Sequence, residues 1–489
     1  MEVWIKVSNP MNSEQRRARF ARKRAQLVCG QVAIAPLDLA ELVEDFGPGT
    51  LHGVEIDYRI GRLGKVLVLS CLVAATLFAA DPPKYTGPGS CAAPACHGAV
   101  QARSATSVQQ NEYSTWVIQD KHAQAFSVLS NPTSVRIAKI LGLPSAATAP
   151  RCLACHSLSP DAADRARTFD ASDGVSCESC HGPASNWLGP HTTKDWTHQQ
   201  SVDAGMKDLR DLTRRSEQCL TCHLGTADKK VDHELIAAGH PDLYFELASF
   251  SAVMPRHWKP KVNQDPWQEV RELATGQAVQ LREHVARVQR NARTGVWPEY
   301  GELDCFACHH SLTASKDSWQ QQRGYENRKP GNPPWNLSRF VVLRQIALEF
   351  DRPAAQQLQA AMNNLYALVS TIGNDRNQVA TQAAQVQTLA TQLETRVKAG
   401  TYDAALVRRL MKSLSGDGQY ISEQGERAAE QAAMAVDSLF VSYSTNATVA
   451  NAAQVRAAIQ ALFQQVQNPS AYNAFNFARQ MGVVNGLLP

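Results

Sequence analysis

The sequence of 489 residues has few free cysteines, little net charge and no long apolar run. Ten of its 12 cysteines form five pairs, and the other two, Cys29 and Cys71, lie before the expected export-cleavage point, so the mature chain has no spare thiols for disulfides. The formal charge is only +4, which gives no reason to expect a nucleic-acid partner. No apolar segment is long enough for a clear transmembrane helix. Residues 336–489 contain neither cysteine nor histidine. Any chemistry that uses cysteine or histidine side chains therefore belongs to the preceding part of the chain.

The paired cysteines occur in five short strings that each end in histidine, which we call motifs 1 to 5 in chain order. Motifs 2 to 5 read Cys-x-x-Cys-His, whereas motif 1 has four residues between its cysteines. The cysteines are Cys91 and Cys96, Cys152 and Cys155, Cys177 and Cys180, Cys219 and Cys222, and Cys305 and Cys308. The histidines are His97, His156, His181, His223 and His309.

Cys-x-x-Cys-His is the attachment signature of c-type haem, in which two thiols bond the porphyrin vinyl groups and the adjacent histidine binds the iron. Zinc sites and redox disulfides also use paired cysteines, but neither requires a histidine directly after every second cysteine. The four regular copies therefore predict a multihaem cytochrome c. The loop of motif 1, which contains Pro94, must bulge for both thiols to reach one porphyrin, and we expect about five haem c groups in all.

Each iron that only carries electrons needs a second axial ligand, distal to the motif histidine. Candidate distal ligands are His122, His191, His240, His233 and His257, with His198, Met206 and Met254 as further options. His233 and His240 are seven residues apart, a spacing that would place them on one face of a helix. His284 lies among charged residues and is expected on the surface, and His310 follows a motif histidine too closely to serve another iron.

The expected fold is mainly α, with little β-structure. Residues 81–335 hold all five motifs, which leaves little room for a core of side chains alone, and we expect short helices and loops wrapped around haems. Residues 336–489 are rich in Ala and Gln, and apolar residues such as Val379, Val386 and Leu393 recur at helical spacing. We predict a bundle of four to six helices there, with a helix start at Asp351.

Residues 1–80 are interpreted as an N-terminal extension followed by a signal peptide at about residues 56–80. Arg59, Arg62 and Lys65 precede an apolar run at 66–78 that ends in small residues, which is the pattern of a secretory signal. This predicts a periplasmic protein, with membrane association if the signal stays uncleaved. The extension at 1–55 has no evident role and is interpreted as a mis-assigned start.

The string Gly174-Val-Ser-Cys177-Glu-Ser-Cys180-His181-Gly-Pro, followed by His191, resembles the tetrahaem cytochrome c-554 family of electron carriers. The Trp and the His122-Ala-Gln-Ala string after motif 1 add to the resemblance, which covers roughly residues 85–225. It implies that His122 and His191 are distal ligands, and that the haem of His156 lacks a strong one. The stretched motif 1, motif 5 and the C-terminal helices depart from the family.

These features favour an electron-transfer protein over an enzyme. The expected partners are redox proteins, namely a quinol-linked or periplasmic donor and a terminal acceptor, and a homo-oligomer formed through the C-terminal bundle is a further option. The alternative is a haem enzyme that acts on a small nitrogen or sulfur species at one five-coordinate iron. The chain contains no Cys-x-x-Cys-Lys string of the kind that nitrite reductases use for a catalytic haem.

Overall fold

The computed structural model describes residues 82–259, 264–310, 323 and 332–489. The predicted N-terminal extension and signal peptide lie outside these residues. In the described part, helices alternate with loops, and extended pairing is limited to two isolated bridges, Tyr85 with Arg165 and Leu303 with Trp335. The predicted mainly α fold is confirmed. None of the described helices combines the length and the apolar character that crossing a membrane requires.

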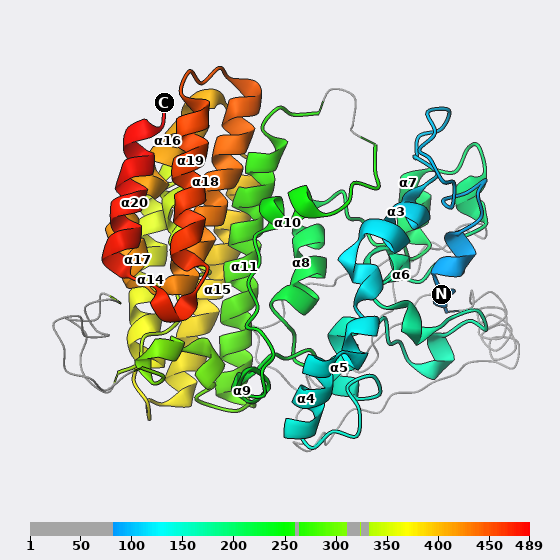
Figure 1. Ribbon diagram of the computed structural model, residues 1–489, viewed down its shortest axis with the longest axis horizontal. Coiled ribbons are helices and arrows are strands. Elements are labelled where there is room, and N and C mark those ends of the chain that lie inside the picture. Colours follow the sequence, from blue (N-terminus) through cyan, green and yellow to red (C-terminus); the bar gives the residue numbers. More distant parts are fainter. Residues whose placement is uncertain (1–81, 260–263, 311–322, 324–331) are drawn as a thin grey trace, which may run out of the picture. The chain divides into compact units, whose positions relative to one another are not determined.

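The part of the chain that carries the motifs consists of short helices joined by long loops (Figure 1). Its α-helices are α3 (Glu112–Gln119), α4 (Pro132–Ile140), α5 (Pro150–His156), α6 (Cys177–His181), α7 (His198–Asp203), α8 (Leu212–His223), α9 (His233–Ala237) and α10 (Leu247–Val253). Short 3-10 helices lie between them: η1 (Pro88–Cys91), η2 (Lys121–Gln124), η3 (Ser127–Ser130), η4 (Ala162–Asp164), η5 (Ala171–Asp173), η6 (Pro190–Thr192), η7 (Tyr300–Glu302) and η8 (Cys305–Ala307). Polar N-caps at Asn131, Asp211 and Asp232 accept hydrogen bonds from the first turns of α4, α8 and α9.

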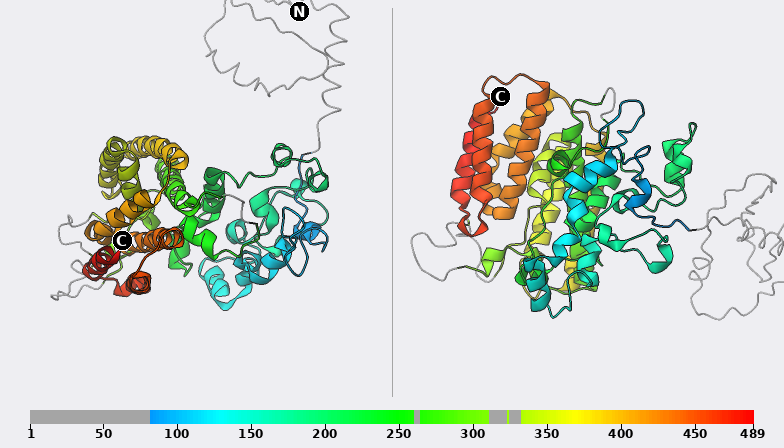
Figure 2. Two further views of the ribbon diagram at one scale, coloured as in Figure 1. Left: turned by 90° about the horizontal axis from the view of Figure 1, so that it is seen from above. Right: turned by 45° about the vertical axis from the view of Figure 1, so that its right-hand side comes forward.

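A long helix, α11 (Gln268–Arg293), precedes a bundle in which the C-terminal helices lie side by side (Figures 1 and 2). The bundle helices are α13 (Val341–Phe350), α14 (Arg352–Val369), α15 (Arg376–Ala399), α16 (Ala404–Gly416), α17 (Gly418–Glu423), α18 (Glu426–Asn446), α19 (Ala452–Val466) and α20 (Ala474–Leu487), with η9 (Pro469–Ala471) before the last. These eight helices of the described segment exceed the predicted four to six, because turns at Asp351 and Asp417 divide longer helical stretches. Asp351 caps α14 as predicted.

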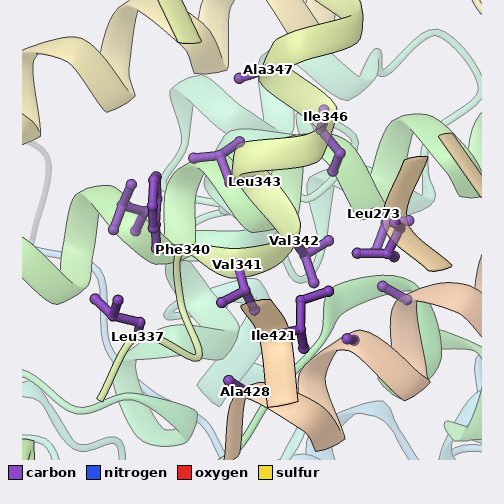
Figure 3. Close-up of a cluster of buried hydrophobic side chains, with 14 of the residues drawn as sticks. Leu273, Leu337, Phe340, Val341, Val342, Leu343, Ile346, Ala347, Ile421 and Ala428 are labelled. Carbon is purple, nitrogen blue, oxygen red and sulfur yellow. The ribbon is translucent and has the colours of Figure 1, made fainter. Parts of the chain in front are cut away.

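The largest hydrophobic cluster of the described residues fills this bundle. The inward positions of α15 are all buried and are Val379, Ala383, Val386, Ala390, Leu393 and Val397. Their spacing of three or four residues forms one stripe along the helix, as the sequence predicted. Figure 3 shows part of the same cluster, where side chains from α11, α13, α17 and α18 lie together. The bundle is therefore held by ordinary apolar packing.

Helix α11 connects this core to the segments that carry the motifs. It packs against α15 and α18 on one side and against α8 and α10 on the other. Gly276 permits the close approach of α10, since a Cβ at that position would lie 2.7 Å from Cβ of Leu247. The largest cluster runs from Ala248 to Leu488 and so continues across residue 335. The predicted division of the chain at residue 335 remains a prediction, and the two sides share a continuous core through α11.

Replacing Leu393 by Ala should weaken this core. The side chain is 1% exposed, and its removal leaves a cavity, so we expect the free energy of unfolding to fall by about 2–5 kcal/mol. Chemical denaturation of the haem-loaded protein, followed by far-ultraviolet circular dichroism, measures the loss. Gln392→Ala alters an exposed position of the same turn and should change the value by less than about 0.5 kcal/mol. Equal losses in the two variants would contradict this packing.

Candidate haem sites

Motifs 2, 3 and 4 each lie on a turn of α-helix, namely α5, α6 and the last turn of α8. Residues i, i+3 and i+4 of a helix share one face, so both thiols and the imidazole of each motif project to the same side. Motif 5 begins on η8, and the His309 N–H donates to the Cys305 carbonyl at 2.8 Å. In motif 1 the His97 N–H donates to the Cys91 carbonyl at 3.2 Å, so the ends of its longer loop stay together.

Six histidines have Nδ1 held by an oxygen acceptor at 2.7–3.2 Å. They are His97, His122, His156, His191, His240 and His257, and the acceptors are Glu112, Asp120 and the carbonyls of Ala125, Trp187, Pro241 and Pro255. A neutral imidazole that donates from Nδ1 keeps its lone pair on Nε2, which can then bind a metal. All six are motif histidines or predicted distal ligands. In His198 it is Nε2 that faces a carboxylate, Asp208 Oδ1 at 3.0 Å, so this ring is not prepared in the same way.

Four motif histidines each face one histidine from outside the motifs at a common separation. The ring centres are 6.2 Å apart for His97 and His191, for His223 and His122, and for His156 and His240. For His309 and His233 the separation is 6.1 Å. Two imidazoles bound to opposite sides of one iron, through bonds of about 2 Å, have their centres about 6 Å apart. The residues present therefore fit an iron between each of these four pairs.

The four pairs fall into two classes by the angle between their ring planes. The planes are nearly parallel in the pairs of motifs 1 and 5, with angles of 7° for His97–His191 and 23° for His309–His233. They are perpendicular in the pairs of motifs 2 and 4, with angles of 89° in both. Ring orientation affects the electronic structure of the iron that two imidazoles share, so the two classes are distinguishable by spectroscopy.

The residues around His122 show how the chain places a distal ligand. Asp120 Oδ1 accepts from both the backbone N–H and Nδ1 of His122, at 3.0 and 2.9 Å. Gly174, just before motif 3, has φ +72°, and a Cβ there would lie 3.1 Å from the His122 carbonyl. The Val175 N–H donates to the same carbonyl at 3.1 Å. The sequence that leads into motif 3 therefore fixes the histidine that faces motif 4.

His181 of motif 3 is the motif histidine that has no ring partner at this separation among the described residues. Its imidazole is deeply buried, which lowers its pKa to about 4, and the nearby His257 lowers the pKa further. His257 contacts Trp258, with ring centres 5.1 Å apart, and is not paired with His181. The resemblance implied that His156 would lack a partner. In the structure His240 faces His156, and it is His181 that stands alone.

Comparison with known proteins agrees with this arrangement of motifs. The family profile described as "Cytochrome c554 and c-prime" matches residues 91–182, which include motifs 1 to 3 and His122. Over these residues the chain is cytochrome c554-like, which supports a multihaem protein of that type. Proteins of this type are haem c cytochromes. No curated protein and no solved structure matches the chain. The matched range ends before motifs 4 and 5 and the helical bundle.

Two expectations about the other histidines of this cytochrome c554-like protein differ from the structure. Helix α9 ends at Ala237, so His233 and His240 do not share a helical face, and they point to different motifs. His284 was expected on the surface but is 3% exposed, with Nε2 2.7 Å from Glu302 Oε2. The charged residues beside His284 pair with carboxylates of other segments, as Arg287 does with Glu302, so this face of α11 is internal.

Several acidic residues that support the sites received no role from the sequence. Glu112 and Asp120 hold ligand imidazoles, and both follow motif 1 within a short distance. Glu178, within motif 3, is 1% exposed and accepts hydrogen bonds from the backbone N–H groups of Thr86, Gly87 and Ala184 at 2.7–2.9 Å. It thereby ties the segment before motif 1 to motif 3. The signal for this role in the sequence was the position of Glu178 inside the extended string around motif 3.

Replacing His191 by Ala removes the ring that faces His97 and leaves both cysteines of motif 1 in place. We expect one iron of the oxidised, haem-loaded protein to change from low-spin to high-spin, because the ring that faces His97 is lost. Resonance Raman spectroscopy reports the spin state. His198→Ala, the matched control, should leave every iron unchanged. An entirely low-spin His191→Ala protein would show that these two rings do not share an iron.

Proposed function

We propose that this protein is an exported cytochrome c that relays electrons through five covalently attached haems. The observation that supports the proposal is the set of four ring pairs, each consisting of a motif histidine and a second histidine 6.1–6.2 Å away. Two histidine ligands occupy both axial positions of an iron, which favours electron transfer over substrate chemistry. Haem iron, when bound, alternates between its ferric and ferrous states and so carries one electron at each site.

The surrounding residues would set the potential of each site. The carboxylates of Glu112 and Asp120 accept from Nδ1 of His97 and His122, which makes these imidazoles stronger donors and stabilises the ferric state. His223 packs against the neighbouring rings of Phe245 and Phe250, with ring centres 5.0 and 5.2 Å away, which shield this side of the imidazole from water. Desolvation lowers the pKa of His223 to about 4, which keeps it neutral and able to bind metal at neutral pH.

The location and partners follow from the same chemistry. Haem c is attached outside the energy-transducing membrane, so we assign residues 56–80 to an export signal and the mature protein to the periplasm. The donor is then a quinol-linked or periplasmic protein, and the acceptor is a reductase, an oxidase or an extracellular acceptor. The C-terminal bundle supports the motif-bearing segments, because α11 packs against both.

Protein-film voltammetry of the haem-loaded protein tests the relay. We expect reversible, non-catalytic waves at low potential, because a site with two histidines has a lower potential than one with histidine and methionine. Adding hydroxylamine, nitrite or sulfite should leave the waves unchanged. A catalytic current with any of these species would contradict a pure relay and indicate an enzyme.

A second candidate function is favoured by one observation, the lack of a ring partner for His181 among the described residues. An iron held by His181 alone would offer one axial position to a small ligand. His257, whose Nδ1 is held by the Pro255 carbonyl at 3.2 Å, lies near enough to influence His181 and is prepared to fill that position. An open position at the His181 iron would allow binding of a small molecule, whereas a position filled by His257 would leave electron relay alone.

The spin state of the oxidised protein separates these arrangements. If the position is open, the unaltered protein has one high-spin iron that binds nitric oxide, and His257→Ala leaves this signal unchanged. A protein with no high-spin iron, in which His257→Ala creates one, would contradict the second candidate and identify His257 as the ligand. His198→Ala serves as the control, because that histidine pairs with Asp208 on its Nε2 side.

A further inference from the structure

Motifs 1, 3 and 4 are joined in that order by direct contacts. The thiols of Cys91 and Cys177 lie close enough to interact, and Glu178 ties the segment before motif 1 to motif 3. Between motifs 3 and 4, Gln218 donates from Nε2 to the Ser179 carbonyl at 2.9 Å. In a c-type site the thiol positions mark the vinyl edge of the porphyrin, so neighbouring thiols indicate neighbouring haem edges.

Motif 4 is joined in turn to motif 2. The thiols of Cys155 and Cys222 lie close enough to interact with each other. His122 adds a second link, because its ring faces His223 of motif 4 while its neighbour Ala125 accepts from Nδ1 of His156 in motif 2, at 2.9 Å. The short segment 122–125 therefore supports both sites.

Residues 232–241 join motif 2 to motif 5. This short segment supplies a distal ring to each, His240 to His156 and His233 to His309. Arg151, directly before the first cysteine of motif 2, pairs with Asp232 and with Glu234. On the other side, the His233 N–H donates to Glu299 Oε1 at 3.0 Å, close before motif 5. Seven residues span at most about 25 Å even when fully extended, so the two sites are neighbours.

The exposure of the thiols indicates which motifs lie at the ends of this arrangement. Three motif cysteines are exposed, Cys96 of motif 1 and both Cys305 and Cys308 of motif 5. The six cysteines of motifs 2, 3 and 4 are all partly buried. Exposure and contacts are independent observations, and both single out motifs 1 and 5.

We propose that the five motifs form one unbranched row in the order 1, 3, 4, 2, 5, with residues 232–241 as the link that adds motif 5 to motif 2. Motifs 1 and 5 are then the two ends at which partner proteins exchange electrons, a role that rests on the proposed relay. Motif 2 is therefore an interior site of this row, because motif 5 lies beyond it and forms the end.

Removal of the haem at motif 5 tests the order, using the double variant Cys305→Ala and Cys308→Ala. The readout is the midpoint potential of each iron, followed by EPR during a redox titration. Perpendicular imidazole planes give a strongly anisotropic EPR signal, and near-parallel planes give a rhombic one. The two anisotropic signals are assigned with the variants His240→Met and His122→Met, which alter the signals of motif 2 and motif 4 respectively. Because charge interactions weaken with distance, the loss of motif 5 should shift the motif 2 potential more than any other.

The matched control removes the haem at the opposite end, with Cys91→Ala and Cys96→Ala. It should shift the motif 3 potential and leave the motif 2 potential unchanged. A motif 5 variant that shifts motif 1, 3 or 4 more than motif 2, or shifts none of them, would overturn the order. Midpoint potentials do not depend on exchange with partners, so this result is separate from the voltammetric test of the relay.

A measurement on the unaltered protein covers the case in which these variants fail to fold. A water-soluble gadolinium complex added to the oxidised protein speeds electron-spin relaxation most at irons near the surface. The row places both near-parallel pairs, those of motifs 1 and 5, at its ends. We expect the rhombic signals to relax faster than the strongly anisotropic ones. Faster relaxation of the anisotropic signals would overturn the assignment of the ends.

Discussion

The proposed haem sites depend on one distance, the separation of two imidazole rings that would share an iron. Four pairs of histidines meet this distance to within 0.1 Å of one another, although their members are 76 to 101 residues apart in the chain. Holding two side chains at such a separation costs conformational entropy, and no direct contact between the rings offsets it. Bonds to a shared iron, as we propose for each pair, would supply the stabilisation. The hydrogen bonds at Nδ1 then serve a clear purpose, since they leave Nε2 of each anchored ring facing the gap.

The C-terminal bundle and the motif-bearing segments are stabilised in different ways. The bundle buries apolar stripes, such as that of α15, in one large cluster. The segments around the motifs have only small clusters of their own, and their helices are short. Porphyrin surface and covalent thioether bonds are therefore needed to complete these segments. Helix α11 packs against both the bundle and these segments. Because it is covered on both sides, its polar residues Thr275, Gln277 and Gln280 are buried.

The sequence predicted features that depend on neighbouring residues better than those that depend on distant ones. Motif spacing, the mainly α fold and the stripe on α15 are local patterns, and the fold and the stripe are confirmed. Which histidine faces which motif is set by the path of the chain, so the spacing of His233 and His240 suggested a shared face that α9 is too short to provide. His284 was misplaced because its charged neighbours were assumed to face solvent, whereas Arg287 forms a buried ion pair with Glu302. The expectation of an open position at His156 came from resemblance alone, and the described residues place the unpartnered ring at His181.

The most direct test of the central claim is an EPR spectrum of the oxidised, haem-loaded protein, with its haems counted by mass on the same sample. The account predicts five haems, two rhombic low-spin signals from the near-parallel pairs and two strongly anisotropic ones from the perpendicular pairs. Low-spin signals of one class only, or a majority of high-spin irons, would contradict it, because the histidine pairs would then not be the ligands of the irons.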